Sequence, residues 1–249
     1  MFRAYFYKLL RSPLFYLAFA ATLALAFYFR ATRSYQHPSL LNGLNSLISM
    51  QDYRKIFVIF SALPFASNFA DEWNSKALVN VVSRKKAGSY AVSNIVMCYI
   101  SAFAAVFSGL MVYALIPSPN MPLYAADYLA WSIYEPIITN GAPMLGIMLM
   151  VFVYASSCGM WAVMGLTASA FFPSRYIAIC APFVFCYVID KFTDDLPDMF
   201  KLGALSFSGS DMRPLPFFLW ANFVFLAVSA VCGVIFTIKV KRRIENELS

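Results

Sequence analysis

Charged residues are scarce in this chain of 249 residues. Asp, Glu, Lys and Arg together make up 12% of it, whereas 61% of the residues are apolar and 18% are aromatic. A typical soluble domain is about 25% charged and about 45–50% apolar, and a disordered chain has the opposite bias. A soluble fold could not hide this much apolar surface, so the composition favours an integral membrane protein.

Histidine and clustered cysteine are also lacking. His37 is the one histidine, and five cysteines lie inside apolar runs: Cys98, Cys158, Cys180, Cys186 and Cys232. A zinc site needs clustered Cys, His or carboxylate ligands, and a disulfide framework needs loop cysteines in a small secreted chain. Neither pattern is present, so we interpret the cysteines as small buried hydrophobes.

Six apolar segments are candidates for helices that cross a bilayer, whose core requires roughly 17–25 helical residues. They are residues 14–29, 56–70, 95–116, 144–172, 176–189 and 217–238. The second and fifth are short, although Lys55 could lengthen the second by snorkelling. No charge lies near the centre of any segment, which argues against a proton relay or a buried ion site. We therefore predict one all-α, polytopic domain over residues 1–249.

The distribution of charge predicts the orientation. With six spans, both termini lie on a side that carries 12 of the 19 basic and 4 of the 12 acidic residues, while the other side carries 7 and 8. Because cytoplasmic loops are enriched in Lys and Arg, both termini are expected to be cytoplasmic. This topology accounts for the net charge of +7, and nucleic-acid binding is not needed to explain it.

Three short helices are predicted outside the spans. Over residues 2–13, apolar and basic side chains occupy opposite faces, which is typical of a helix that lies in the headgroups of the inner leaflet. Residues 40–50 and 123–134 are interpreted as surface-lying helices on the outer side, the latter rich in interfacial Tyr and Trp.

The longest cytoplasmic loop, residues 71–94, contains a further predicted helix. Trp73, Ala77 and Val81 recur every four residues and give it one apolar face. Its acidic start and basic end suit the helix dipole, and Gly88 could terminate it. This helix is either a solvated linker or a docking surface for a cytoplasmic partner.

Patterns required for catalysis are missing. His37 lies in an outer loop and cannot pair with a serine inside a span, and no paired metal ligands or carboxylates lie at membrane depth. The sequence also has no Walker-type phosphate loop. We therefore predict no enzymatic activity, no metal site and no cofactor bound directly by this chain.

The layout of the chain resembles the permease subunits of type 2 ABC exporters, a group that includes the bacteriocin (lantibiotic) immunity and bacitracin-resistance permeases. The resemblance rests on Phe69-Ala70-Asp71-Glu72 at the end of the second span and on Ser83-Arg84 before the third. It also rests on the six spans, the N-terminal interfacial helix and the basic tail. The family often has Gly where Ser75 or Lys76 stands and a Lys near Asn94, so the chain departs from the pattern there.

This resemblance implies a function. The helix within residues 71–86 would be the coupling helix that docks on a cytoplasmic ATPase, and the residues assigned to coupling are Glu72, Trp73, Lys76, Val81, Ser83 and Arg84. Glu72 and Arg84 would fix the helix and bond to the partner, and Trp73 and Val81 would make apolar contact with either the ATPase or the chain's own spans. Two permease chains, as a homodimer or a heterodimer, would assemble with two ATP-binding cassette subunits that bind ATP and Mg. The expected activity is export of an amphipathic or hydrophobic substrate, such as an antimicrobial peptide, across a bacterial plasma membrane. Expected partners also include membrane lipid but no nucleic acid.

A non-transporting scaffold or a passive channel subunit is the alternative function. The polar side chains that a channel would need are scattered over the spans: Asn68, Ser101, Ser108, Ser156, Ser157, Thr167 and Asn222. Hydroxyls in apolar helices commonly bond to carbonyl groups of the preceding turn, which would account for most of them. Small residues four apart, Ala155 with Gly159 and Ser229 with Gly233, predict close packing within the chain or across a dimer.

Overall fold

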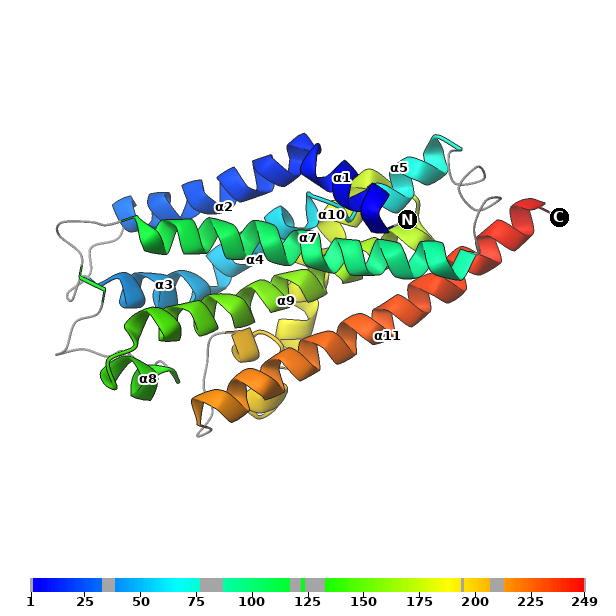
Figure 1. The fold of residues 1–249 in the computed structure, drawn as a ribbon. Helices are drawn as coiled ribbons and strands as arrows, with labels where there is room; N and C mark the ends of the chain where they lie inside the picture. Colours follow the sequence, from blue (N-terminus) through cyan, green and yellow to red (C-terminus); the bar gives the residue numbers. More distant parts are fainter. Residues whose placement is uncertain are drawn as a thin grey trace.

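A computed structural model of the protein describes residues 2–32, 39–76, 87–116, 122–123, 133–193, 195–206 and 213–248. These residues form a helical bundle in which no strand occurs (Figure 1). The helices are α1 (Phe2–Leu10), α2 (Pro13–Thr32), α3 (Leu40–Ser49), α4 (Gln51–Ala62), α5 (Asn68–Asn74), α7 (Ala87–Leu115), α8 (Glu135–Thr139), α9 (Pro143–Phe171), α10 (Arg175–Phe192), the 3-10 turns η1 (Asp198–Phe200) and η2 (Ala204–Ser206), and α11 (Pro214–Leu248). The predicted all-α class is confirmed for this part of the chain.

Four helices, α2, α7, α9 and α11, are long and apolar enough to cross a membrane. Three of them begin at a proline, which suits the first helical position because the missing N–H needs no partner there. In α9, 78% of the most apolar 18-residue stretch is buried, against 22% in α2 and 28% in α11. The central helix is therefore α9, and the exposed apolar faces of α2 and α11 are those expected of a membrane protein.

The predicted second span, residues 56–70, is not one continuous helix. Helix α4 ends at Ala62, the backbone turns through residues 63–67, and α5 begins at Asn68. Pro64 lies in this turn and has no N–H with which to continue the helical hydrogen-bond ladder. The chain instead passes along the bundle as α3, α4 and α5 in succession (Figure 1).

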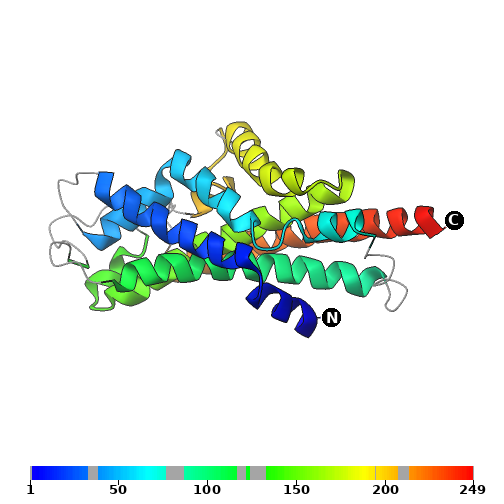
Figure 2. The ribbon, with the colours of Figure 1, turned by 90° about the horizontal axis from the view of Figure 1, so that it is seen from above.

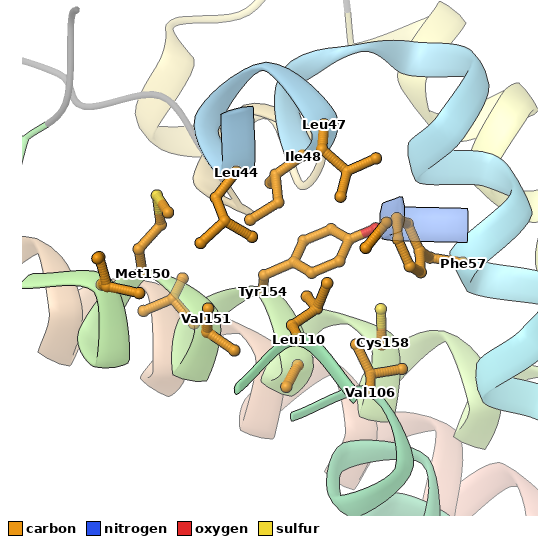
Figure 3. Close-up of a cluster of buried hydrophobic side chains, with 14 of the residues drawn as sticks. Leu44, Leu47, Ile48, Phe57, Val106, Leu110, Met150, Val151, Tyr154 and Cys158 are labelled. Carbon is orange, nitrogen blue, oxygen red and sulfur yellow. The ribbon is translucent and has the colours of Figure 1, made fainter. Parts of the chain in front are cut away.

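The prediction that residues 40–50 form a surface-lying helix is wrong, because α3 is buried. Leu44, Leu47 and Ile48 are each at most 1% exposed. They lie along one side of the ring of Tyr154, which projects from α9 (Figure 3). Helix α3 carries no charged residue, so it can enter the apolar core without leaving an ion unpaired.

The predicted fifth span, residues 176–189, corresponds to the 18-residue helix α10. This helix covers only the half of the bundle that lies toward the chain termini (Figure 2). A Cβ atom on Gly165 of α9 would lie 2.6 Å from Cγ of Pro182, so the glycine permits the close approach of α10. Of the six predicted spans, residues 56–70 and 176–189 are not among the four helices with the length and apolarity of a span.

Other boundaries also differ from the predictions. Helix α7 begins at Ala87, eight residues before the predicted third span, so Gly88 lies in its first turn and does not terminate a preceding helix. Most of the helix predicted over residues 123–134 falls outside the described residues. Residues 2–10 are helical as predicted, and α1 and the C-terminal end of α11 lie toward the same end of the bundle (Figure 1).

The two small-residue pairs pack inside the chain. A Cβ atom on Gly159 would lie 3.0 Å from the Tyr99 ring, and one on Gly233 would lie 3.2 Å from Ile95 Cδ1. Both neighbours belong to α7. These glycines therefore allow α7 to pack closely on α9 and α11. Packing within the chain was one of the two interpretations, and packing across a dimer was the other.

Candidate functional site

The carboxylate of Glu72 lies at the centre of a polar cluster between α1, α5 and α7. We define the Glu72 cluster as six residues: Tyr5 and Lys8 of α1, Asn68 and Glu72 of α5, and Tyr90 and Asn94 of α7. Lys8 Nζ lies 3.1 Å from Glu72 Oε1 and donates to Asn68 Oδ1 at 2.5 Å. The Lys8 ammonium group therefore bonds to two side chains of α5.

The other carboxylate oxygen, Oε2, accepts hydrogen bonds from one residue of α7 and one of α1. The hydroxyls of Tyr90 and Tyr5 donate to Glu72 Oε2 at 2.8 and 3.3 Å. Asn68 Nδ2 donates to Asn94 Oδ1 at 2.7 Å, and Asn94 Nδ2 donates in turn to the Tyr90 carbonyl oxygen at 3.1 Å. Two charged side chains, two amides and two tyrosine hydroxyls thus connect α1, α5 and α7.

The surroundings strengthen these bonds. Tyr90 and Asn94 are fully buried, and the Glu72 side chain is only 12% exposed, whereas the Lys8 side chain is 53% exposed. Burial, followed by the charge of Glu72, raises the pKa of Tyr5 far above its ordinary value. The Tyr5 hydroxyl therefore remains a donor throughout the physiological range, and each hydrogen bond to the carboxylate is worth about 1.5–3 kcal/mol.

Two other predicted coupling residues, Trp73 of α5 and Lys76 just beyond its end, have different environments. Trp73 packs on Phe69, with ring centroids 5.9 Å apart, and the Arg243 guanidinium of α11 lies 5.1 Å from its ring. Lys76 is exposed and has a backbone φ of +55°, in the left-handed region. That conformation ends a helix, and α5 stops at Asn74. The helix predicted to start at residue 71 is therefore interrupted before residue 77.

Three of the six predicted coupling residues are Val81, Ser83 and Arg84. They lie outside the described residues. The structure brings Glu72 and Trp73 into contact with other helices of this chain, and it leaves Lys76 at the surface. The sequence-based prediction had Glu72 fix the helix and bond to a partner, and the observed contacts are internal.

A second charged site, a buried ion pair, lies between α4 and α10. The Arg54 guanidinium of α4 pairs with the Asp190 carboxylate of α10, and the two side chains are 6% and 12% exposed. Gly203 covers the pair closely, since a Cβ atom there would lie 2.8 Å from Arg54 Nη1. Arg54 and Asp190 lie just beyond the apolar runs from which the spans were predicted, so neither was placed inside a span.

Most residues of the Glu72 cluster were missed because each looks ordinary alone. Asn68 and Asn94 interrupt apolar runs, and an amide inside a span generally has a partner on another helix. On that basis, a hydrogen bond between Asn68 and Asn94 could have been predicted from the sequence. Arg54 and Asp190 carried a similar signal, since opposite charges at the ends of two short spans are better paired than left alone.

Other polar side chains of the spans bond within their own helices. The hydroxyls of Ser101, Ser157 and Thr167 donate to the carbonyl oxygens of Cys98, Tyr154 and Val163. Such bonds leave few hydroxyls to line an aqueous path. Within the described ranges, no three His, Cys, Asp or Glu side chains are grouped so that they could hold a metal ion.

The cysteines fit the prediction only in part. All five are free thiols. Cys98, Cys158 and Cys186 are buried, whereas Cys180 is exposed on α10.

Comparisons of the chain with protein-family models, curated proteins and solved structures found no match. Its function must therefore be inferred from the contacts described above.

Proposed function

We propose that this chain is the transmembrane subunit of an ATP-driven exporter whose ATPase is a separate cytoplasmic protein. Four apolar helices support the placement in a membrane. In this proposal, α3–α5 and α10 complete six passes, and both termini are cytoplasmic. Two such subunits and two ATPases would move an amphipathic or hydrophobic substrate out of a bacterial plasma membrane.

The Glu72 cluster is the observation that supports the proposal most. Helices α5 and α7 flank residues 77–86, the segment proposed to contact the ATPase. Glu72 binds Tyr90 of α7 at 2.8 Å and Lys8 of α1 at 3.1 Å. A displacement of residues 77–86 would therefore move α1, α5 and α7 together, which is what an ATPase needs in order to act on a membrane bundle.

The burial of Glu72 separates two roles within this region. The Glu72 side chain is only 12% exposed, and its carboxylate accepts hydrogen bonds from this chain's own donors, so it transmits movement without touching the partner. Contact with the ATPase is assigned to residues 77–86, including Val81, Ser83 and Arg84. Binding and coupling should consequently be lost in different variants.

The test compares three variants purified from native membranes in mild detergent. Arg84→Ala should release the ATPase. Glu72→Gln should retain it but abolish the stimulation of ATP hydrolysis by substrate, because Lys8 loses its charged partner. Lys201→Ala, at a site predicted to face the opposite side of the membrane, is the control and should retain both properties.

Two results would contradict the proposal. The first is that no ATPase accompanies even the unaltered chain. The second is that Glu72→Gln and Lys201→Ala have the same substrate-stimulated ATP hydrolysis as the unaltered complex. Antimicrobial peptides and other amphipathic compounds are the substrates to screen.

A further inference from the structure

An apolar groove of about 410 Å³ runs between α7 and α11 on the surface of the bundle. We define the α7–α11 groove by six of its lining residues: Val92, Ile95 and Val96 of α7, and Ala230, Val234 and Ile238 of α11. From Ala230 to Ile238 it extends eight residues, or about 12 Å along the helix. Its apolar lining suits a hydrocarbon chain better than a polar ligand.

The groove ends among basic residues. On α11, Ala230, Val234 and Ile238 follow one another at intervals of four and share one face. The same face continues to Arg242, four residues beyond Ile238, and to the neighbouring Lys241. Both are exposed at the surface, so two cations lie one turn beyond the apolar groove.

The remaining cations of this tail face another direction. Lys239 Nζ lies 5.0 Å from the centroid of the Phe171 ring, and Arg243 donates to the Phe171 carbonyl oxygen at 2.5 Å. Both therefore turn toward α9. Glu245 lies 3.8 Å from Lys241 and offsets part of its charge, which leaves Arg242 as the stronger anchor for an anion.

From this arrangement we infer that the α7–α11 groove binds an anionic phospholipid. One acyl chain would lie along Val96 and Val234, and the phosphate would meet Arg242 and Lys241 at the predicted cytoplasmic surface, where anionic lipids are concentrated. The exposed Ser89 of α7 stands at the same end of the groove and can donate to a headgroup.

The charges favour a lipid over a second copy of this chain. If two copies met through this groove around a two-fold axis, their α11 tails would lie side by side. Lys241 and Arg242 of one copy would then face the same residues of the other, and like charges across an interface are unfavourable. An anionic lipid neutralises these residues instead.

The experiment uses the full chain in nanodiscs of phosphatidylcholine containing phosphatidylglycerol, released into mild detergent for native mass spectrometry. The double variant Lys241→Gln/Arg242→Gln should retain about 25-fold less phosphatidylglycerol, since each cation near a membrane surface contributes about fivefold. The control, Lys201→Gln/Arg213→Gln, changes the net charge equally at the opposite end and should retain the lipid.

A second pair of variants tests the groove itself. Ala230→Leu narrows the groove and should release the lipid, whereas Ala227→Leu adds the same side chain at an exposed position of α11 that does not line the groove and should not. Equal retention of phosphatidylcholine and phosphatidylglycerol would overturn the inference. A dimer that Ala230→Leu converts to a monomer would also overturn it, because a second copy would then occupy the groove. None of these measurements involves an ATPase, so they succeed or fail independently of the proposed function.

Discussion

Removing one partner of the Arg54–Asp190 pair should destabilise the bundle far more than removing both. The two side chains are 6% and 12% exposed, and breaking a buried ion pair by removing one partner costs about 3–5 kcal/mol. Replacing both ions by apolar side chains is commonly neutral or stabilising. We therefore expect Asp190→Asn and Arg54→Met to be severe, and Arg54→Met/Asp190→Leu to be mild.

Cys158 provides the assay. Its thiol is fully buried, and its carbonyl oxygen accepts a hydrogen bond of 3.2 Å from Ser61 of α4, so labelling requires α4 to open away from α9. With the other four cysteines replaced by alanine, the rate at which a maleimide dye labels the protein reports this opening. A loss of 3–5 kcal/mol predicts labelling about a hundredfold to several thousandfold faster.

The matched control is Asp198→Asn, which breaks the exposed pair with Lys201 at 3.1 Å. Exposed pairs contribute about 0–1 kcal/mol, so labelling should accelerate no more than about fivefold. The reasoning is refuted if Asp190→Asn and Asp198→Asn label at the same rate. It is equally refuted if the double variant Arg54→Met/Asp190→Leu labels as fast as either single variant.

Three further predictions concern the Arg54–Asp190 pair and the Glu72 cluster. Gly203→Ala should cost about 1–3 kcal/mol in the thiol assay, because the new Cβ atom would lie 2.8 Å from Arg54 Nη1. Gly141→Ala is the comparison: its Cβ atom would meet no neighbour, but its φ of +88° is strained for alanine. The two variants together separate the cost of steric overlap from the cost of backbone strain. Tyr90→Phe should cost about 1.5–3 kcal/mol, since Glu72 loses its 2.8 Å donor, and thermal unfolding in detergent would measure it. The raised pKa of Tyr5 means that the unfolded chain loses this proton near pH 10 while the folded chain keeps it. The unfolded state then binds fewer protons, so stability should fall as pH rises above 10, and Tyr5→Phe should flatten that part of the pH profile.

The long helices could be predicted from the sequence because apolarity over about 20 residues has one common explanation, a span. Residues 14–29, 144–172 and 217–238 all lie within or nearly coincide with observed helices. The break at residues 63–67 was missed although Pro64 marks it. Hydropathy alone does not distinguish a continuous helix from two helices joined by an apolar turn.

The interior contacts could not be predicted in the same way. Glu72 was singled out from a local pattern, but its partners Tyr5 and Tyr90 lie 67 and 18 residues away, and only the packing of α1 and α7 brings them together. The burial of α3 likewise depends on the space beside Tyr154 of α9. Residues 40–49 alone are compatible with a membrane surface as well as with a core.

ATP hydrolysis by the protein purified from native membranes in mild detergent tests the central claim most directly. If the chain is the transmembrane subunit of an exporter, a soluble protein with a Walker phosphate loop should co-purify in roughly equimolar amount and hydrolyse ATP. Arg84→Ala should then remove both the protein and the activity. A chain that purifies alone, without ATP turnover, would contradict the account and favour the scaffold or channel.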